Sequence, residues 1–340
     1  MKDTLVVELI TPSPYAATAE MQGAPAQGLI TKPSIMGHIQ IARIDHWIKN
    51  VFVLPGVVVA LSVDRARLDS WSWVNFVLGM LAICLIASSN YVINEILDAP
   101  FDRFHPIKRN RPVPSGQVSL PWAYFQWIAL MIAGLVIGLA VSRIFTLTLI
   151  ALWLMGCIYN IPPIRSKNLP YADTISEGIN NPLRMLAGWY LTGTILIAPA
   201  SLLLSYWMTG CYFMAIKRFA EFREIGDHYG SARYRKSFSF YSEQRLLVSI
   251  TFYGSHAMLF FGAFIMRYRM ELILSFPLVA LVMALYLSIA FKPNSAAQCP
   301  EHLYREPALM AAVVTCAVVM TILLFISLPS LHRIFSPSLS

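Results

Sequence analysis

The stretch Asn90-Tyr-Val-Ile-Asn-Glu-Ile-Leu-Asp-Ala-Pro-Phe-Asp-Arg-Phe-His-Pro-Ile-Lys-Arg-Asn-Arg-Pro ends a long apolar run of the chain. Within it Asn94, Asp98 and Asp102 recur every four residues, a spacing that advances about 40° per step on a helix and keeps the three side chains near one face. Charges next to a hydrocarbon phase are energetically costly, so they persist where they have a function. The stretch therefore predicts a membrane helix that ends in a polar site.

The oxygen atoms of this stretch suit Mg²⁺, which takes one or two carboxylates and fills its other positions with water and substrate phosphate. Glu95 lies three residues before Asp98, so we expect it to join the same face. The predicted metal ligands are Asn94, Glu95, Asp98 and Asp102. Pro100 cannot continue regular helical hydrogen bonding, so we expect Asp102 on a kinked or unwound turn.

Basic residues follow the acids directly: Arg103, Lys108, Arg109 and Arg111. We expect them to bind the phosphate oxygens that a metal ion leaves uncovered. The alternative is that acids and bases merely cap a helix at the lipid headgroups. The ordered spacing is more than capping requires, which favours a binding site.

The composition indicates an all-α, polytopic membrane protein. The 340 residues are 57% hydrophobic and only 13% charged, and the mean hydropathy is +0.59; soluble proteins carry roughly twice that charged fraction. Apolar runs long enough to cross about 30 Å of hydrocarbon predict nine spans. These lie near residues 48–63, 73–94, 122–141, 144–162, 174–195, 199–217, 246–266, 271–291 and 308–330.

The distribution of Lys and Arg predicts the orientation. The four loops on one side hold 15 of these bases, whereas the loops and tail on the other side hold 6. We therefore expect a cytoplasmic N-terminus and a periplasmic or extracellular C-terminus, in the inner (plasma) membrane. Residues 1–38 are expected to form a disordered cytoplasmic leader without a signal peptide, 39–332 the transmembrane domain and 333–340 a short tail.

A second charged cluster ends the predicted sixth span. Lys217 and Glu221 are four residues apart on one face, and Arg218 and Glu224 flank them. Taken alone, this is a salt-bridged helix end at the membrane surface. Because the second and sixth spans end on the same side, however, both clusters can face one central cavity that opens to the cytoplasm.

These motifs resemble the UbiA superfamily of intramembrane transferases over roughly residues 40–330. Asn94-Glu-x-x-Asp-x-x-x-Asp102 is similar to the first aspartate-rich motif of that family, with Glu95 in place of the usual Asp. The resemblance implies a nine-helix bundle and a Mg²⁺-dependent transferase. Its substrates would be polyprenyl phosphates or prenyl diphosphates within the membrane.

Three segments resemble the decaprenyl-phosphate phosphoribosyltransferase branch: Arg43-x-x-x-Trp-x-Lys-Asn50, His105-Pro-x-Lys-Arg-x-Arg-Pro112 and Lys217-Arg-Phe-Ala-Glu221. Aromatic prenyltransferases are instead expected to place a metal-binding acid at position 217. One segment points the other way: Tyr159-Asn-Ile-Pro-Pro-Ile-Arg-Ser-Lys167 resembles a loop of prenyltransferases that modify chlorophyllides and quinone precursors. Three segments against one favour the phosphoribosyltransferase branch, and the prenyltransferase branch remains open as the alternative.

The first branch implies transfer of 5-phosphoribose from phosphoribosyl pyrophosphate to a polyprenyl phosphate. The second implies transfer of a prenyl group from its diphosphate to an aromatic, quinone-precursor or tetrapyrrole acceptor. A non-catalytic lipid carrier is a remote third reading. Membrane lipids are expected partners, and nucleic acid is not. Asn94, Asp98 and Asp102 are the predicted catalytic residues. The predicted substrate-binding residues are Lys49, Lys108, Arg109, Arg111, Tyr159, Arg165, Lys167, Arg184, Lys217, Arg218 and Glu221.

The fifth apolar run is unusually polar, since it contains Asp173, Glu177, Asn181 and Arg184. Arg184 either lines the cavity or pairs with Glu177 or Asn180 between helices. Tyr159, Tyr171 and Trp189 are candidates for stabilising an allylic cation in the prenyl-transfer reading. We assign no metal or catalytic role to the five cysteines, or to His46, His105 and His228, because none shows metal-ligand spacing.

Overall fold

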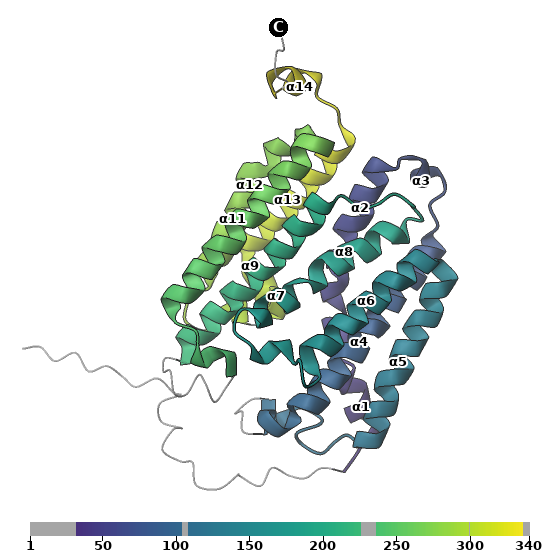
Figure 1. Cartoon of the computed structure of the whole chain (residues 1–340), viewed down its shortest axis with the longest axis vertical. Coiled ribbons are helices and arrows are strands. Elements are labelled where there is room, and N and C mark those ends of the chain that lie inside the picture. The colour runs from purple at the N-terminus through teal and green to yellow at the C-terminus, as the bar shows by residue number, and fades with distance from the viewer. Residues whose placement is uncertain (1–31, 104–107, 226–235, 299, 336–340) are drawn as a thin grey trace, which may run out of the picture.

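The structure is a computed structural model that describes residues 32–103, 108–225, 236–298 and 300–335. All regular elements in these residues are helices (Figure 1). The α-helices are α1 (Ile35–Ile41), α2 (Leu54–Val63), α3 (Ala66–Asp69), α4 (Trp73–Asp102), α5 (Leu120–Val141), α6 (Arg143–Asn160), α7 (Ala172–Gly178), α8 (Asn180–Leu191), α9 (Ala200–Ile225), α11 (Glu243–Tyr268), α12 (Phe276–Ile289), α13 (Pro307–Phe325) and α14 (Pro329–Phe335). The 3₁₀ helices are η1 (Ile44–Val53), η2 (Lys108–Asn110), η3 (Ser166–Asn168), η4 (Lys236–Ser239), η5 (Met270–Ser275), η6 (Ala296–Gln298) and η7 (Pro300–Arg305).

Serine caps mark where several long helices begin. The hydroxyl groups of Ser72, Ser142 and Ser242 each accept a hydrogen bond from the backbone N–H three residues later. These caps satisfy backbone donors that would otherwise lack an intrahelical partner. Short polar turns thus separate apolar helices that bury their own backbone hydrogen bonds, as a membrane requires.

Seven helical segments are long and apolar enough to cross a membrane: Ile35–Val63, Trp73–Asp102, Leu120–Val141, Arg143–Asn160, Glu243–Tyr268, Met270–Ile289 and Pro307–Phe325. They correspond to seven of the nine predicted runs. The fifth predicted run breaks at Ile179 into α7 and α8, and α9, the sixth, is too polar to qualify. The chain is therefore a polytopic membrane protein with seven candidate spans, and the count of nine remains a prediction.

The helices pack along their lengths into one bundle. α4 lies against α5 and α6, and α9 lies against α11. Two glycines let α2 and α8 approach closely, because a side chain at Gly56 would collide with the backbone of Met185 and one at Gly188 with the backbone of Val53. Such small residues at helix interfaces are typical of membrane proteins, where van der Waals packing drives association.

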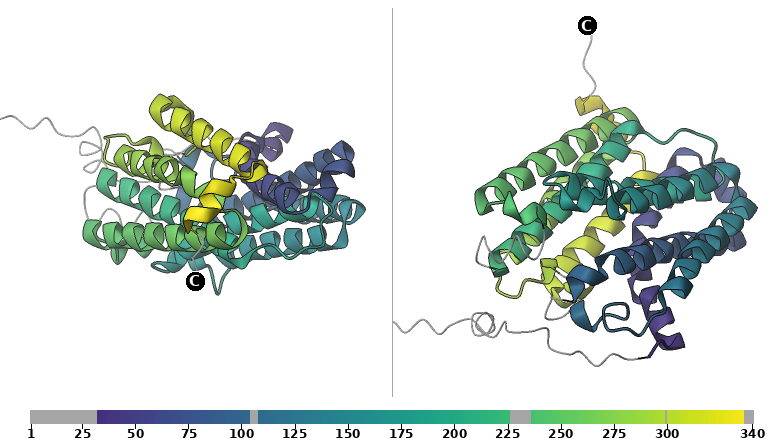
Figure 2. Two further views of the ribbon diagram at one scale, coloured as in Figure 1. Left: turned by 90° about the horizontal axis from the view of Figure 1, so that it is seen from above. Right: turned by 60° about the horizontal axis from the view of Figure 1, so that its bottom comes forward.

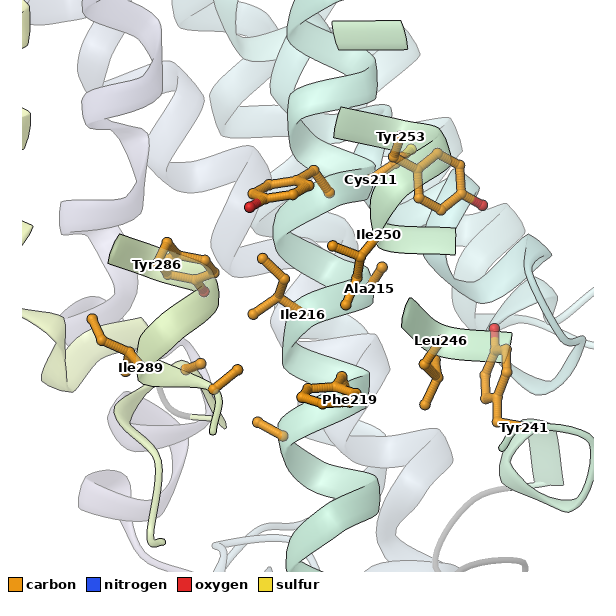
Figure 3. Packing of buried hydrophobic residues seen from close by; sticks show 14 of the residues in the cluster. Cys211, Ala215, Ile216, Phe219, Tyr241, Leu246, Ile250, Tyr253, Tyr286 and Ile289 are labelled. Atoms are coloured by element: carbon orange, nitrogen blue, oxygen red, sulfur yellow. The ribbon is translucent and has the colours of Figure 1, made fainter. Parts of the chain in front are cut away.

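The part of α9 around Ile216 and Phe219 packs against α11 and α12 through apolar side chains. Figure 3 shows Ile216 and Phe219 on α9 between Ile250 on α11 and Tyr286 on α12. All four side chains are buried. The charged side chains near the end of α9 diverge: Arg218 reaches Asp173 on α7, whereas Arg223 pairs with Glu243 at the start of α11.

The ends of α4 and α9 lie at the same end of the bundle, the lower end in Figure 1, and we call it the stripe end. The right-hand view of Figure 2 brings this end forward, and the connection after α4 (blue) lies there beside α1 (purple). The opposite end, which carries α14, is called the far end. It holds the turns that follow α2, α8 and α11.

The local structure departs from the sequence-based expectations at the end of α4 and at the start of α1. α4 stays helical through Pro100 to Asp102, and the N–H of Arg103 still bonds to the carbonyl of Ala99, so the unwound turn expected there is wrong. α1 begins at Ile35, inside the stretch assigned to the leader, because Ser34 caps it. The remainder of the leader (1–31), the last five residues of the tail, His105 and His228 lie outside the described residues.

Candidate functional site

Four polar side chains form a row along the face of α4 that looks toward α6, and we call this row the polar stripe: Asn90, Asn94, Asp98 and Asp102. The amide of Asn90 donates to the carbonyl of Leu152 at 3.1 Å. Any side chain at Gly156 would collide with that amide, so glycine on α6 makes room for the stripe. The four-residue spacing that the sequence showed is therefore a contact surface between α4 and α6.

Asp98 is held by two bases from the connection between α6 and α7, residues 161–171, which we call the basic loop. Its Oδ1 accepts from Nη2 of Arg165 at 2.7 Å and from Nζ of Lys167 at 2.6 Å. Both bases lie about 70 positions away in sequence. Such convergence of charge-assisted hydrogen bonds on one carboxylate requires the tertiary fold.

Asn160, the last residue of α6, connects these groups. Its Oδ1 accepts from Nδ2 of Asn94 at 2.5 Å and from Nζ of Lys167 at 2.9 Å. Its own amide group donates to the carbonyl of Gly156 at 2.9 Å. Sequence reasoning missed Asn160. The sequence feature that could have revealed it is an amide side chain at the end of an apolar run, within the Tyr159–Lys167 segment.

Asp102 pairs with a base from the connection that follows α4. Its Oδ2 accepts from Nη1 of Arg111 at 2.6 Å. Lys108 and Arg109 lie in η2, just before Arg111, and Arg109 is exposed. The predicted run of bases thus contacts the polar stripe through Arg111.

Glu95 lies apart from the polar stripe. Its side chain is only 1% exposed, Oε2 accepts from Nη2 of Arg43 at 3.3 Å, and Oε1 accepts from the backbone N–H of Val113 at 3.2 Å. Both oxygens are therefore engaged, one with Arg43 just before η1 and the other with the connection after α4. This geometry fits an internal ion pair that fastens these segments to α4, and we leave Glu95 out of the proposed metal ligands.

The other three predicted ligands, Asn94, Asp98 and Asp102, fit a magnesium ion. In the hydrogen bonds of the described residues, Asp98 uses only Oδ1 and Asp102 only Oδ2, so each carboxylate keeps one oxygen for another ligand. The stripe offers two carboxylates and an amide, and no group of three or more carboxylate, imidazole or thiol side chains that could hold a metal ion occurs in the described residues. Two carboxylates and the amide oxygen of Asn94 match a metal that takes its other ligands from water and phosphate.

The second predicted cluster is an internal ion-pair network. Arg218 is 2% exposed; its Nε donates to Oδ2 of Asp173 at 3.1 Å and its Nη1 to Oε2 of Glu221 at 2.7 Å. Since two acids already satisfy this guanidinium, Arg218 and Glu221 are placed to hold helices together rather than to contact substrate directly.

Lys217 differs from its neighbour. It is half-buried, and no residue in the described ranges forms a hydrogen bond or ion pair with it. It lies seven positions after Gly210, which abuts Gly178 and Asn181, so it shares the face of α9 that looks toward α7 and α8. The second cluster thus offers one cation without an acid.

The two clusters adjoin through Tyr159. Its ring centroid lies 5.9 Å from Nζ of Lys167, and the phenol is within electrostatic range of Arg218. The sequence predicted that both clusters share one side of the membrane domain, and the structure places them at the same end of the bundle. The aromatic ring lies where the basic loop meets α9.

The other predicted residues have partners outside this arrangement. Nζ of Lys49 is 2.9 Å from Nδ1 of His46, and Nε of Arg184 donates to Oδ1 of Asn50 at 3.2 Å. Arg184 therefore bonds to η1 instead of Glu177 or Asn180. Asp173 and Glu177 lie on α7 and Asn181 lies on α8, because α7 ends at Gly178.

Two of the three candidate aromatics serve packing. Tyr171 makes edge contacts with Phe240 and Tyr241, with ring centroids 5.7 and 5.6 Å away. Trp189 is fully buried and its indole donates to the carbonyl of Leu196 at 2.8 Å, toward the far end. Of the three, only Tyr159 adjoins the bases of the stripe end.

A sequence profile described as the UbiA prenyltransferase family matches residues 52–303. Decaprenyl-phosphate phosphoribosyltransferase of Mycolicibacterium smegmatis is 30% identical over 227 residues, which cover 63% of this chain and 65% of that protein. The enzyme of the same name from Corynebacterium glutamicum is 31% identical over 193 residues, 54% of each chain. The chain thus spans less than two thirds of the length of these relatives.

The fold also resembles solved structures. A UbiA homolog from Archaeoglobus fulgidus, bound to GPP and Mg²⁺, superposes with a TM-score of 0.65. The superposition covers 84% of this chain and 99% of that one, at 19% sequence identity. At this identity the likeness establishes the helical architecture alone.

Proposed function

The chain belongs to the UbiA prenyltransferase family, and from this premise we propose that it is a Mg²⁺-dependent intramembrane transferase that acts on polyprenyl phosphates or diphosphates. The proposal places the reaction at the stripe end, where Asn94, Asp98 and Asp102 would hold the metal. The UbiA homolog solved with GPP and Mg²⁺ supports both the metal and the prenyl substrate class.

The reaction that fits these residues best is transfer of 5-phosphoribose from phosphoribosyl pyrophosphate to a polyprenyl phosphate. The bond between C1 of the ribose and the diphosphate oxygen breaks, a bond from C1 to the acceptor phosphate oxygen forms, and diphosphate leaves. Bound Mg²⁺ would supply charge neutralisation on the diphosphate. The acceptor oxygen is already anionic at neutral pH, so the step needs no general base.

Bases of the stripe end would bind the anionic donor. Arg165 and Lys167 lie on Asp98, and Arg111 lies on Asp102, so each base is already beside the metal ligands. Preorganised cations that face developing negative charge are a large contribution to catalysis. Together they hold the leaving group while positive charge builds on the ribose.

The preference for phosphoribosyl transfer over prenyl transfer rests on the position and surroundings of Lys217. A second divalent ion at the end of α9 would need acids there, but position 217 is a lysine, and Asp173 and Glu221 are occupied by Arg218. An unpaired cation suits a second phosphate group, such as the 5-phosphate of the ribose or the acceptor phosphate. Similarity to the mycobacterial and corynebacterial phosphoribosyltransferases points the same way.

Prenyl transfer to an aromatic, quinone-precursor or tetrapyrrole acceptor is the second candidate. The position of Tyr159 beside Lys167 favours it, because an aromatic face next to a diphosphate site can stabilise an allylic cation. In this reading the same bases hold the prenyl diphosphate.

One experiment separates the candidates. Purified full-length protein is incubated with Mg²⁺ and either phosphoribosyl pyrophosphate plus polyprenyl phosphate, or prenyl diphosphate plus aromatic acids. Phosphoribosylated lipid is the expected product, and chelation should abolish its formation. Prenylated aromatic product alone would establish the second candidate, and no product in either mixture would favour the non-catalytic carrier.

The orientation is part of the proposal. With the bases of the stripe end in the cytoplasm, the N-terminus is cytoplasmic and the C-terminus lies outside the plasma membrane. A reporter fused after Ser340 should be external, whereas one inserted near Gly230 should be cytoplasmic. Both reporters on one side would contradict this orientation.

A further inference from the structure

Asp173, at the start of α7, is a fully buried carboxylate that accepts hydrogen bonds from Arg218, Ser237, Tyr241 and Thr174. Its Oδ2 accepts from Nε of Arg218 at 3.1 Å and from the hydroxyl of Ser237 at 3.2 Å. Its Oδ1 accepts from the hydroxyl of Tyr241 at 2.6 Å and from that of Thr174 at 3.4 Å. A buried charge is tolerated when it is satisfied in this way. The side chain thus ties α7 to the end of α9 and to the segment that precedes α11.

The phenol of Tyr241 extends this network into the basic loop. It donates to Asp173 and accepts from the backbone N–H of Tyr171 at 2.7 Å. Burial and the charge of Asp173 raise the pKa of Tyr241, so its hydroxyl remains a donor at physiological pH. The N–H of Asp173 also bonds to the carbonyl of Leu169 at 3.0 Å. The last turn of the basic loop is therefore fixed to one buried acid.

The basic loop needs such an anchor, because two of its residues have unfavourable backbone angles. Arg165 has φ of 33° and Tyr171 has φ of 62°. Non-glycine residues adopt positive φ only when the surrounding structure holds them there. Lys167 lies between these two positions. Arg165, the first of the two residues with positive φ, is the other base that bonds to Asp98.

We propose that Asp173 is a positioning residue that, through Tyr241 and Tyr171, presents Arg165 and Lys167 to Asp98 and to the diphosphate of the donor. This inference rests on the proposed function and adds a residue that never touches substrate. It predicts that the anchor and the bases act as one unit. A purely structural acid would lower stability without acting through Lys167.

Pyrophosphate in the presence of Mg²⁺ is a suitable probe, because both candidate reactions release diphosphate. In full-length protein, Asp173→Asn keeps the side-chain volume but removes the charge, and it should weaken pyrophosphate binding roughly tenfold. Lys167→Met should weaken it similarly. The double variant should bind only about twofold more weakly than Lys167→Met alone, because coupled residues are not additive. Additive effects, or unchanged binding in Asp173→Asn, would overturn the proposal.

Two further measurements keep the test decisive. Hydrogen exchange should accelerate at the amides of residues 166–171 in Asp173→Asn, with the amides of α5 unchanged; a loop that exchanges normally refutes the anchor whatever the protein binds. If the loop loosens but the native protein does not bind pyrophosphate, the proposed function fails instead.

Matched variants cover loss of folding. Tyr241→Phe removes only the hydroxyl between Asp173 and Tyr171, and it should reproduce the loop exchange and a smaller loss of binding. Glu271→Gln neutralises another buried acid, which accepts from the N–H of Leu328 at the far end. It should lower the melting temperature but leave pyrophosphate binding within about twofold. If Tyr241→Phe leaves both loop exchange and binding unchanged, the anchor does not act on the loop.

Discussion

The two ends of the bundle use charged residues differently. At the far end, three arginines bond locally or to backbone carbonyls: Arg67 pairs with Asp64 three positions earlier, and Arg269 donates to the carbonyl of Ser62. Arg65 donates to the carbonyl of Phe325. Carbonyl groups at helix ends need such donors, so this end shows what capping at a membrane surface looks like.

At the stripe end, by contrast, bases from distant segments converge on carboxylates. Asp98 takes two bases from the basic loop, and Asp102 takes Arg111. Asn160 and Asn94 add amide groups to the same network. The difference teaches that membrane-surface charge alone does not produce this pattern. The capping interpretation describes the arginines of the far end, and the convergence at the stripe end supports the proposed binding site.

The strongest test of this comparison removes one acid from each end. Asp98→Asn should lower turnover by at least about a hundredfold, because it removes a charge that would hold the metal. Asp64→Asn should leave turnover within about twofold, since the partners of its side chain among the described residues, Arg67 and Thr194, lie at the far end. Both variants are assayed for product formation with Mg²⁺. Near-normal turnover in Asp98→Asn protein would end the assignment of the stripe as a metal site.

The next largest effect is expected at Lys217. Lys217→Ala should raise KM for the phosphorylated donor roughly 10- to 150-fold, because a charge-assisted contact contributes about 1.5–3 kcal/mol. Lys217→Asp should be worse, since it places a carboxylate against phosphate. Lys292→Ala is the control: this exposed lysine pairs with Glu306 at 2.6 Å, and its loss should leave KM unchanged. Unchanged KM in Lys217→Ala would remove the main support for the phosphoribosyl reading. A gain of prenyl transfer in Lys217→Asp would favour the other branch.

The sequence predicted the polar stripe because helical periodicity is a local property. Spacing alone brought Asn94 and Asp98 onto one face, and apolar runs located seven helices long enough to cross a membrane. Spacing could not reveal that Glu95 pairs with Arg43, because that contact joins segments 52 positions apart. Because Glu95 is close to Asp98 in sequence, we expected the two acids to share a role, but they contact different segments of the fold.

The second cluster was harder to predict for the same reason. Lys217 and Glu221 suggested a helix-end salt bridge, but the buried partner of Arg218 is Asp173, 45 positions earlier. Ser237 and Tyr241 complete that network from a third segment. Side chains that meet only through tertiary packing leave little signal in a single sequence. What the sequence does show is a set of polar residues in otherwise apolar runs.

A third prediction concerns Glu95, whose contacts make it a structural acid. Glu95→Gln should lower the free energy of unfolding by about 1–3 kcal/mol, because a buried hydrogen-bonded charge is lost. The midpoint of thermal unfolding measures this effect. Binding of Mg²⁺, or of Mn²⁺ as its spectroscopic substitute, should be retained by the folded fraction. If metal affinity falls while the midpoint is unchanged, Glu95 belongs with the polar stripe after all.

The smallest expected effects separate two similar ion pairs. Arg111 pairs with Asp102 at the stripe end and Arg67 pairs with Asp64 at the far end, with the arginine side chains 28% and 34% exposed. Partly exposed pairs contribute at most about 1 kcal/mol to stability, so Arg111→Ala and Arg67→Ala should shift the melting temperature equally little. Only Arg111→Ala should also raise KM for the donor, by roughly fivefold, because only this arginine lies where phosphate would bind. If neither variant changes KM, Arg111 caps a helix as Arg67 does, and the contrast between the ends reduces to Asp98 and the basic loop.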